Sequence, residues 1–224
     1  MLLFYREIQT TGDLPAIMPL VQEFVGIAKS VGVPLQAWAG SNGCVAGTLA
    51  FSANYESLAA RAEGTAKLGS AKGWWETVRK FREYAVSSQP DLIYSYVSGG
   101  TTGGETPDGT VVQQNYFQLN ATGGDFLAAI KWMTEFVELT KSITGVEASI
   151  INTIYGTLGQ IGYFAGYANA AQVDEARAKL IANAEWFPKF LEGGKFAMPG
   201  SVMQRHIVKI AQLRNLIHQS EMGK

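Results

Sequence analysis

The sequence contains very little cysteine and histidine, which excludes several kinds of functional site. Its 224 residues include one cysteine, Cys44, and two histidines, His206 and His218. A single cysteine excludes an intramolecular disulfide and a cysteine-rich zinc site. Histidines and carboxylates nowhere occur together at the spacing of metal ligands, so no metal is expected. Cys44 follows Gly43 in an uncharged stretch, which favours a buried thiol over a nucleophile.

The chain also lacks an excess of either charge. Its 18 Lys and Arg residues stand against 19 Asp and Glu residues, for a net charge of −1. Such a balance produces no field that would attract nucleic acid or an anionic membrane, so neither is expected as a partner. The opening MLLFYREIQ has no basic lead and too short an apolar run for a signal peptide. Together with the single cysteine, this favours the cytoplasm.

Familiar catalytic motifs are absent as well. The sequence has no GxSxG elbow, Walker loop, HExxH helix or EF-hand loop. The glycine-rich stretch SGGTTGGETPDG at 98–109 lacks the Lys-Ser/Thr ending of a phosphate-binding loop. It is followed by TVVQQNYFQLN, which reads as a strand rather than a helix. We interpret residues 98–110 as a flexible linker.

The segments on the two sides of this linker resemble each other. Matching pieces occur in the same order, namely GD at 12–13 and 124–125, EFV at 23–25 and 135–137, KS at 29–30 and 141–142, ARA at 60–62 and 176–178, and KF at 80–81 and 189–190. The sequence therefore predicts a tandem duplication. The first repeat is residues 1–97 and the second is residues 111–208, followed by a C-terminal helix and tail at 209–224.

Each repeat shows the same order of elements. The first has a strand LLFYREIQ, an amphipathic helix after Asp13, a hairpin of LQAWA and VAGTLAF, a helical region at 56–84 and a strand LIYSYV. The second has NYFQLN, a helix after Asp125, a hairpin of SIINTIY and IGYFAGY, a helical region at 173–191 and SVMQRHI. The order βαββαβ indicates an α+β chain made of two ferredoxin-like repeats.

Two long stretches carry no charged side chain. Residues 30–55 and residues 148–173 each form an uncharged run of 26 residues that contains the predicted hairpin. Polar residues and glycines within these runs argue against membrane-spanning helices. An antiparallel hairpin without charges has no face suited to water, and the helices of one repeat cover only one face. We therefore expect the sheets of the two repeats to face each other.

This doubled pattern resembles the dimeric α+β barrel superfamily in its fused, single-chain form. The resemblance extends over nearly the whole chain and implies that the two antiparallel sheets form a barrel. The superfamily includes cofactor-free monooxygenases, haem-degrading enzymes, chlorite dismutase-like haem proteins and stress-responsive barrel proteins. It therefore implies no single activity.

Four polar residues at strand positions are the candidates for ligand binding: Arg6, Gln118, Tyr94 and His206. The resemblance to cofactor-free monooxygenases implies a cleft for an apolar or aromatic small molecule, whose oxygens such side chains would polarise. The other interpretation is structural. In that case Arg6 pairs with a neighbouring carboxylate, and the tyrosines fill the core.

Three hypotheses for the function follow. The first is a small-molecule-binding protein that acts, if it is an enzyme, without a cofactor. The second is a non-enzymatic structural protein whose C-terminal helix and tryptophans support a homo-oligomer. The third is a haem-binding barrel, in which the resemblance to chlorite dismutase-like proteins implies His206 as the axial ligand.

Overall fold

The computed structural model describes residues 1–100, 106–120 and 126–210. The first half contains β1 (Leu2–Thr10), α1 (Leu14–Ser30), β2 (Gln36–Gly40), β3 (Thr48–Tyr55), α2 (Leu58–Ser70), α3 (Trp74–Arg82), β4 (Ala85–Ser88) and β5 (Leu92–Ser98). The second half contains β6 (Val111–Gln118), α4 (Phe126–Thr144), β7 (Ala148–Tyr155), β8 (Gln160–Tyr167), α5 (Ala170–Ala182), α6 (Trp186–Glu192), a short 3₁₀ turn (Gly193–Lys195) and β9 (Met203–Lys209). The predicted linker separates β5 from β6, and the predicted C-terminal helix lies outside the described residues.

Eight of the strands close into an antiparallel barrel. Their order is β3-β2-β9-β6-β8-β7-β5-β1, and β1 pairs with β3 to complete the ring, while β4 pairs only with one end of β1. The two halves are joined along both edges, where β2 pairs with β9 and β5 pairs with β7. The predicted barrel is therefore confirmed. The halves are linked by edge-to-edge hydrogen bonds in addition to the packing of one sheet on the other.

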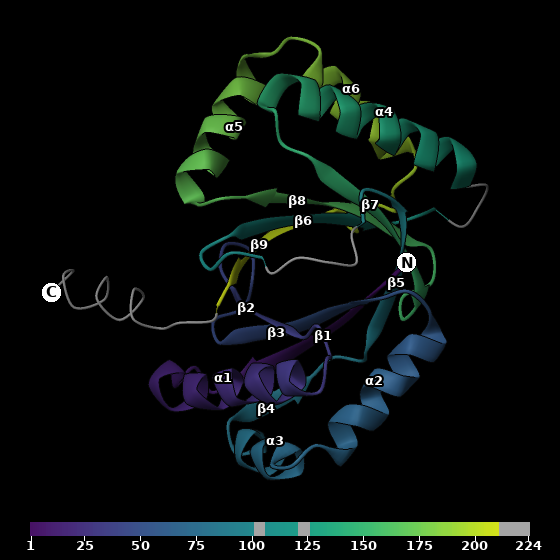
Figure 1. Cartoon of the computed structure of the whole chain (residues 1–224). Coiled ribbons are helices and arrows are strands. Elements are labelled where there is room, and N and C mark those ends of the chain that lie inside the picture. Colours follow the sequence, from purple (N-terminus) through teal and green to yellow (C-terminus); the bar gives the residue numbers. More distant parts are fainter. Residues whose placement is uncertain (101–105, 121–125, 211–224) are drawn as a thin grey trace, which may run out of the picture.

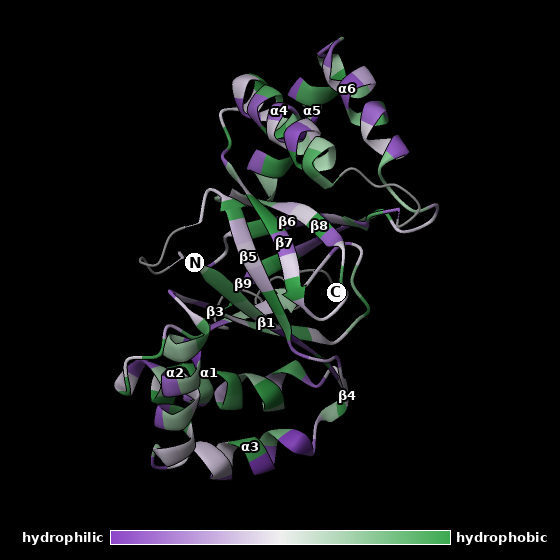
Figure 2. Cartoon of the chain, turned by 90° about the vertical axis from the view of Figure 1, so that its right-hand side faces the viewer, coloured by the Kyte–Doolittle hydropathy of each residue, from purple (hydrophilic) through white to green (hydrophobic). Residues whose placement is uncertain are grey.

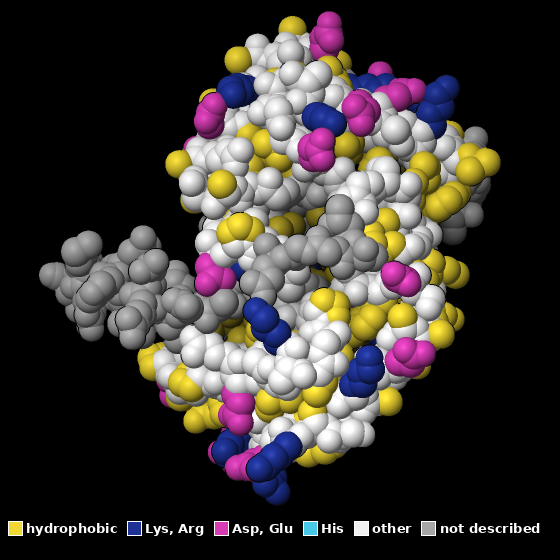
Figure 3. Space-filling model, viewed as in Figure 1, with side chains coloured by type: hydrophobic (Ala, Val, Ile, Leu, Met, Phe, Trp, Pro, Cys, Tyr) yellow, Lys and Arg dark blue, Asp and Glu magenta, His cyan; other side chains and the backbone are white. Residues whose placement is uncertain are grey.

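The helices form two layers on opposite sides of the strands. Helices α1, α2 and α3 cover the barrel on one side, and α4, α5 and α6 cover it on the other (Figure 1). A view turned by 90° keeps the same separation (Figure 2). Charged side chains lie mainly over these two helical layers and more sparsely over the belt between them (Figure 3). This distribution follows from the uncharged hairpins, which contribute strands to the belt.

Small polar side chains start the helices in both halves. Asp13 accepts a hydrogen bond from the Ala16 amide at the start of α1. Ser57 caps α2 in the same way, and Asn169 caps α5. These caps satisfy amide groups that have no partner inside the helix.

Each of the helical regions predicted at 56–84 and 173–191 consists of two helices. In the first half, α2 and α3 are separated at Gly73. Its φ of 87° is in the left-handed region, so a right-handed helix cannot continue through it. In the second half, the Asn183 side chain accepts bonds from the amides of Glu185 and Trp186 and so starts α6. The short strand β4 was not predicted. Strand β6 (Val111–Gln118) lies within the predicted strand TVVQQNYFQLN and extends further toward the N-terminus than the NYFQLN segment that matches the first repeat.

The barrel interior is a packed core to which both halves contribute. It contains the buried residues Leu3, Tyr5, Trp38, Ala50, Tyr94, Ile151 and Ile207, from strands β1, β2, β3, β5, β7 and β9. The prediction that the uncharged hairpins are covered on both faces is therefore confirmed, because β3 and β8 also pack against helices on their outer faces.

One ion pair crosses between the halves inside this core. Arg205 of β9 lies 2.6 Å from the Glu7 carboxylate of β1, and its Nε donates to Gln114 Oε1 at 2.8 Å. The guanidinium also lies over the rings of Tyr5 and Tyr116, at 5.8 and 5.5 Å from their centroids. Burial lowers the pKa of Arg205, but the nearby Tyr5, Tyr116 and Glu7 outweigh it and raise that pKa further. The guanidinium is therefore held charged.

Replacing this arginine by methionine is expected to destabilise the barrel. Arg205→Met leaves the Glu7 carboxylate, whose side chain is only 22% exposed, without its cation. The free energy of unfolding in urea should fall by about 2–3 kcal/mol, and a second change, Glu7→Gln, should restore part of it. The control is Lys179→Met, which breaks the exposed Lys179–Glu175 pair and should change stability little. Equal losses in the two methionine variants would contradict the expectation.

Candidate functional site

A pocket of about 530 Å³ lies between the outer face of the first-half strands and helices α2 and α3. We call it the first-half pocket. It is lined by Phe4, Arg6, Ile8, Phe24, Leu35, Phe51, Tyr55, Arg61, Thr65, Leu68, Gly69, Trp74, Trp75, Val78, Phe81, Arg82, Ala85, Ser88 and Asp91. Its volume falls in the range of about 300–1,000 Å³ that is usual for small-molecule sites.

The inner wall of the first-half pocket is aromatic. The ring of Phe24 makes edge-to-face contacts with Phe51, Trp74 and Phe81, at centroid distances of 5.9, 5.1 and 5.4 Å. Phe51 and Phe81 are also in edge contact. Interlocked rings hold one another in place, so this wall is preformed for a flat apolar surface.

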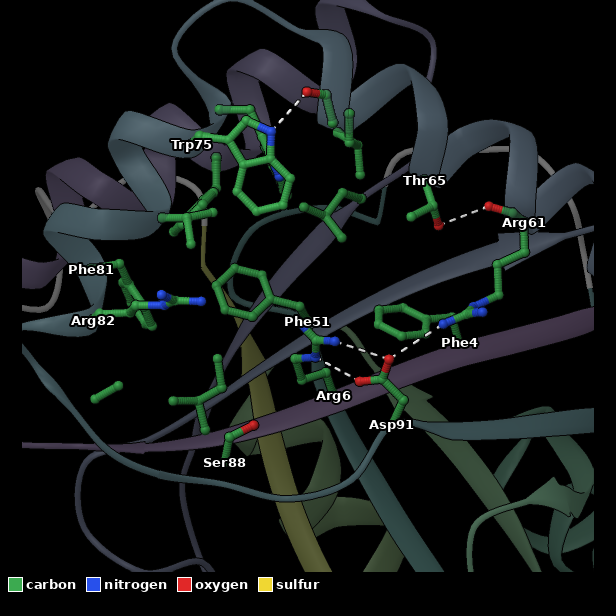
Figure 4. A pocket seen from close by; sticks show the side chains of 18 of the residues that line it. Phe4, Arg6, Phe51, Arg61, Thr65, Trp75, Phe81, Arg82, Ser88 and Asp91 are labelled. Atoms are coloured by element: carbon green, nitrogen blue, oxygen red, sulfur yellow. Dashed lines mark hydrogen bonds and ion pairs between the residues drawn. The ribbon is translucent and has the colours of Figure 1, made fainter.

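The polar part of the pocket is an arrangement of two arginines around one carboxylate. Arg6 donates to both oxygens of Asp91, at 2.6 and 2.9 Å, and Arg61 of α2 donates to the same carboxylate at 3.3 Å. Both guanidinium groups lie against the Phe4 ring, at 5.8 and 5.1 Å from its centroid. Figure 4 shows Asp91 between the two arginines, beside the aromatic side chains.

Alternation along β1 places these groups. Successive side chains of a strand point to opposite faces. Tyr5 and Glu7 therefore point into the barrel, while Phe4 and Arg6 point toward α2 and the pocket. Asp91 stands just before β5, which pairs with β1, so its carboxylate lies within reach of Arg6.

The Arg6–Asp91–Arg61 group retains capacity for a ligand. Each guanidinium has five N–H donors. Arg6 uses two of them on Asp91 and Arg61 uses one. The carboxylate thus orients two cations while neutralising only one unit of charge. An oxygen atom of a bound molecule can accept from the remaining donors.

The helix that covers this group packs loosely. In α2 only Gly64 is buried, and a Cβ there would lie 3.0 Å from the Tyr55 ring, which is a tight contact. The Trp75 side chain is exposed, and its Nε1 donates to the Gly69 carbonyl across the α2–α3 junction. Helices α2 and α3 therefore roof the pocket without filling it.

The second half fills the equivalent space with aromatic side chains. Trp132 and Phe136 stack at 5.4 Å, and Trp186 stacks on Phe190 at 5.7 Å. Phe196, which follows the 3₁₀ turn, packs against Trp132 in the same cluster. The halves share an order of elements, but the described second half has more ring contacts between sheet and helices than the first.

The four predicted site residues lie in different places. Arg6 lies in the first-half pocket, and its predicted pairing with a neighbouring carboxylate is confirmed by Asp91. Tyr94 lies in the barrel interior with 2% of its surface exposed, and burial raises its pKa. Gln118 ends β6, where its Nε2 donates to the Leu158 carbonyl.

His206 lies on the outer face of β9, away from the first-half pocket. Its Nε2 is 3.3 Å from Gln113 Oε1, and its Nδ1 is 3.4 Å from Asn42 Nδ2. The structure therefore does not bring the four residues together. Sequence reasoning missed Asp91 and Arg61 as pocket residues. A signal for them was present in the sequence. Phe4, Arg6 and Ile8 alternate along β1 and so share its outer face, where an arginine beneath helices needs a polar partner.

Two further observations concern only the described part of the chain. Within it, no three His, Cys, Asp or Glu side chains gather closely enough to hold a metal ion. None of the helices described there is both long enough and apolar enough to cross a membrane.

Solved structures show which proteins share this architecture. No protein-family profile matches the sequence, and no curated protein matches it significantly. A "putative monooxygenase" from Fusobacterium nucleatum matches 93% of this chain and 91% of its own, with a TM-score of 0.71 and 11% identity. The chain has the dimeric α+β barrel fold.

Two other proteins have the same dimeric α+β barrel fold. An "anthrone oxidase-like protein" matches 93% of this chain and 91% of its own, with a TM-score of 0.64 and 11% identity. A "putative monooxygenase" from Lactobacillus acidophilus matches 93% of each chain, with a TM-score of 0.58 and 11% identity. Because both halves are matched in all three, the likeness extends to the whole single-chain barrel. At 11% identity it is a likeness of fold.

The surroundings of His206 predict its titration. Burial lowers the pKa of His206 below the ordinary 6.5, while the charge of Asp174 raises it. Asp174→Asn should therefore lower this pKa further, as measured by NMR titration with His206→Gln to assign the signal. The lowered pKa also sets how stability depends on pH. The neutral His206 ring contributes fully to the free energy of unfolding above the unfolded-chain pKa near 6.5. This contribution is lost as the pH falls through the lower pKa of the folded protein. An unchanged pKa in Asp174→Asn would contradict this.

Proposed function

We propose that this protein binds a flat apolar or aromatic small molecule in the first-half pocket and oxidises it with O₂, without a cofactor. The observation that carries the proposal is the pocket itself, in which an aromatic wall faces the Arg6–Asp91–Arg61 group. Apolar walls with a few converging polar groups are typical of ligand sites. The descriptions of similar barrels as monooxygenases or as anthrone oxidase-like support the type of reaction.

The chemistry that fits these residues starts with an acidic C–H next to a conjugated carbonyl, as in anthrone. Loss of a proton to water places negative charge on the carbonyl oxygen. The free N–H donors of Arg6 and Arg61 are suited to stabilising that oxygen. O₂ then takes up the electrons. One oxygen atom becomes the new C=O, and the other leaves as water, so that CH₂ plus O₂ gives C=O plus H₂O.

We also infer that the halves are two ferredoxin-like repeats that arose by duplication, and that only the first serves as a binding site. Their common order of elements supports the first statement. The aromatic cluster around Trp132 and Phe136, which fills the second half, supports the second. The expected stoichiometry is therefore one ligand per chain.

Filling the pocket is expected to abolish binding without unfolding the protein. Thr65 lines the pocket from α2, and its neighbour Ala66 is exposed outside it. Thr65→Trp should lower the affinity for 2-naphthol at least about tenfold in isothermal titration calorimetry, because an indole occupies the ligand volume. Ala66→Trp is the matched control and should bind like the unmodified chain, at one site per chain. Equal affinities in the two variants would place the ligand elsewhere.

Oxidation of anthrone is the test of activity. The protein should consume O₂ and form anthraquinone faster than buffer does, and Arg6→Met should lower kcat/KM by about 10²-fold, the usual cost of losing an oxyanion donor. Thr65→Trp should abolish the excess rate. Binding without turnover would reduce the proposal to a binding protein. Absence of both binding and turnover would favour the structural, non-enzymatic alternative.

A further inference from the structure

One charged side chain of the first-half pocket takes no part in the Arg6–Asp91–Arg61 group. Arg82 is the last residue of α3 and lines the pocket beside Ala85 and Ser88. In the parts of the chain that the structure describes, it forms no ion pair. By contrast, Lys80 on the same helix is held by Glu76 at 2.9 Å.

The lining of the pocket has an excess of positive charge. Its 19 residues include three arginines, Arg6, Arg61 and Arg82, and a single carboxylate, Asp91. Asp91 offsets one of the two charges that it contacts and does not contact the third. A cavity with apolar walls and an uncompensated cation attracts an anionic group in preference to a neutral one.

The arginines stand at different ends of the pocket. In Figure 4, Arg82 and Arg61 lie on opposite sides of the Phe51 ring, and the guanidinium of Arg82 is directed toward the aromatic side chains. A flat molecule lying on Phe51 with one oxygen at the Arg6–Arg61 end therefore extends its other end toward Arg82.

We propose that the ligand is an aromatic carboxylate and that Arg82 binds its carboxylate group. This inference rests on the proposed binding function and adds the chemical class of the ligand and the residue that selects it. A guanidinium matches a carboxylate with two parallel N–H···O bonds, and such charge-assisted bonds are stronger than bonds between neutral groups. The aromatic wall receives the ring system, and Arg82 selects for the charge.

The competing explanation of Arg82 is the dipole of α3. Cations in the last turn of a helix are favourable whatever they face. Arg79 and Lys80 lie in the same turn of α3 and do not line the pocket. Arg79 is therefore the control, because it shares the helix end and the charge but not the cavity.

The experiment compares 2-naphthoate with 2-naphthamide, which has nearly the same shape and no charge. Affinities are measured by calorimetry at low salt for the unmodified chain, Arg82→Gln and Arg79→Gln. The unmodified chain and Arg79→Gln should bind the acid at least about tenfold more tightly than the amide, as one charge-assisted pair allows. Arg82→Gln should bind both with nearly equal affinity, because only the acid loses a charge-assisted pair. In the unmodified chain, the ratio of the affinity for the acid to that for the amide should decrease as NaCl is added, because salt screens the charge of Arg82.

The outcomes separate this inference from the proposed function. Equal affinities of the unmodified chain for acid and amide, with both lost in Thr65→Trp, would overturn the carboxylate assignment and leave the pocket as the binding site. A preference for the acid that survives in Arg82→Gln would overturn the role of Arg82. Failure of both probes and of 2-naphthol to bind would overturn the binding function and this inference with it.

Discussion

Closure of the barrel between the two halves is the constraint on which the rest of the structure depends. Taken alone, the first half is a sheet with edges β2 and β5, and the second is a sheet with edges β9 and β7. Each would leave unpaired backbone groups at both edges and an uncharged hairpin facing water. The β2–β9 and β5–β7 ladders remove all four edges at once. The two halves therefore complete each other as one folding unit, although each has its own helical layer.

Closure also decides where a ligand site can be. The barrel interior is occupied by Tyr5, Tyr94 and the Arg205–Glu7 pair, so it serves as a core in which Arg205 binds Glu7 and Gln114. Space for a ligand is found instead between the strands and their helices. Strand β1 serves both compartments, since alternate residues point inward to the ion pair and outward to Arg6 in the pocket. The same strand thus stabilises the barrel and presents the polar group of the site.

Features encoded by neighbouring residues could be predicted from the sequence, whereas contacts between residues far apart in the chain could not. Uncharged runs, periodic apolar positions and capping residues are local signals, and they predicted most of the elements and the facing of the two sheets. The barrel itself was implied by the resemblance to the dimeric α+β barrel superfamily. The break between α2 and α3 has a weaker sequence signal. A glycine such as Gly73 is tolerated inside a helix, so the sequence alone does not show that its positive φ ends one here. The partners of single side chains are not local. Asp91 is 85 residues from Arg6, and His206 faces Gln113 only because β9 pairs with β6 in one particular register. A one-residue shift of that register would exchange its inward and outward side chains.

The two halves place different side chains between sheet and helices. Both halves place aromatic rings between sheet and helices, and Phe24 in one occupies the role of Phe136 in the other. In the second half, the backbone at Gly193 approaches the Trp132 ring so closely that a Cβ there would lie 2.2 Å from it. That close approach leaves no room for a side chain at Gly193, so the turn is packed directly on the ring. In the first half, Gly73 has a φ of 87° at the α2–α3 junction, and Trp74 and Trp75, which follow it, line the pocket together with the three arginines. With the fold held in common, the proposed restriction of ligand binding to the first half rests on which large side chains stand between sheet and helices in each half.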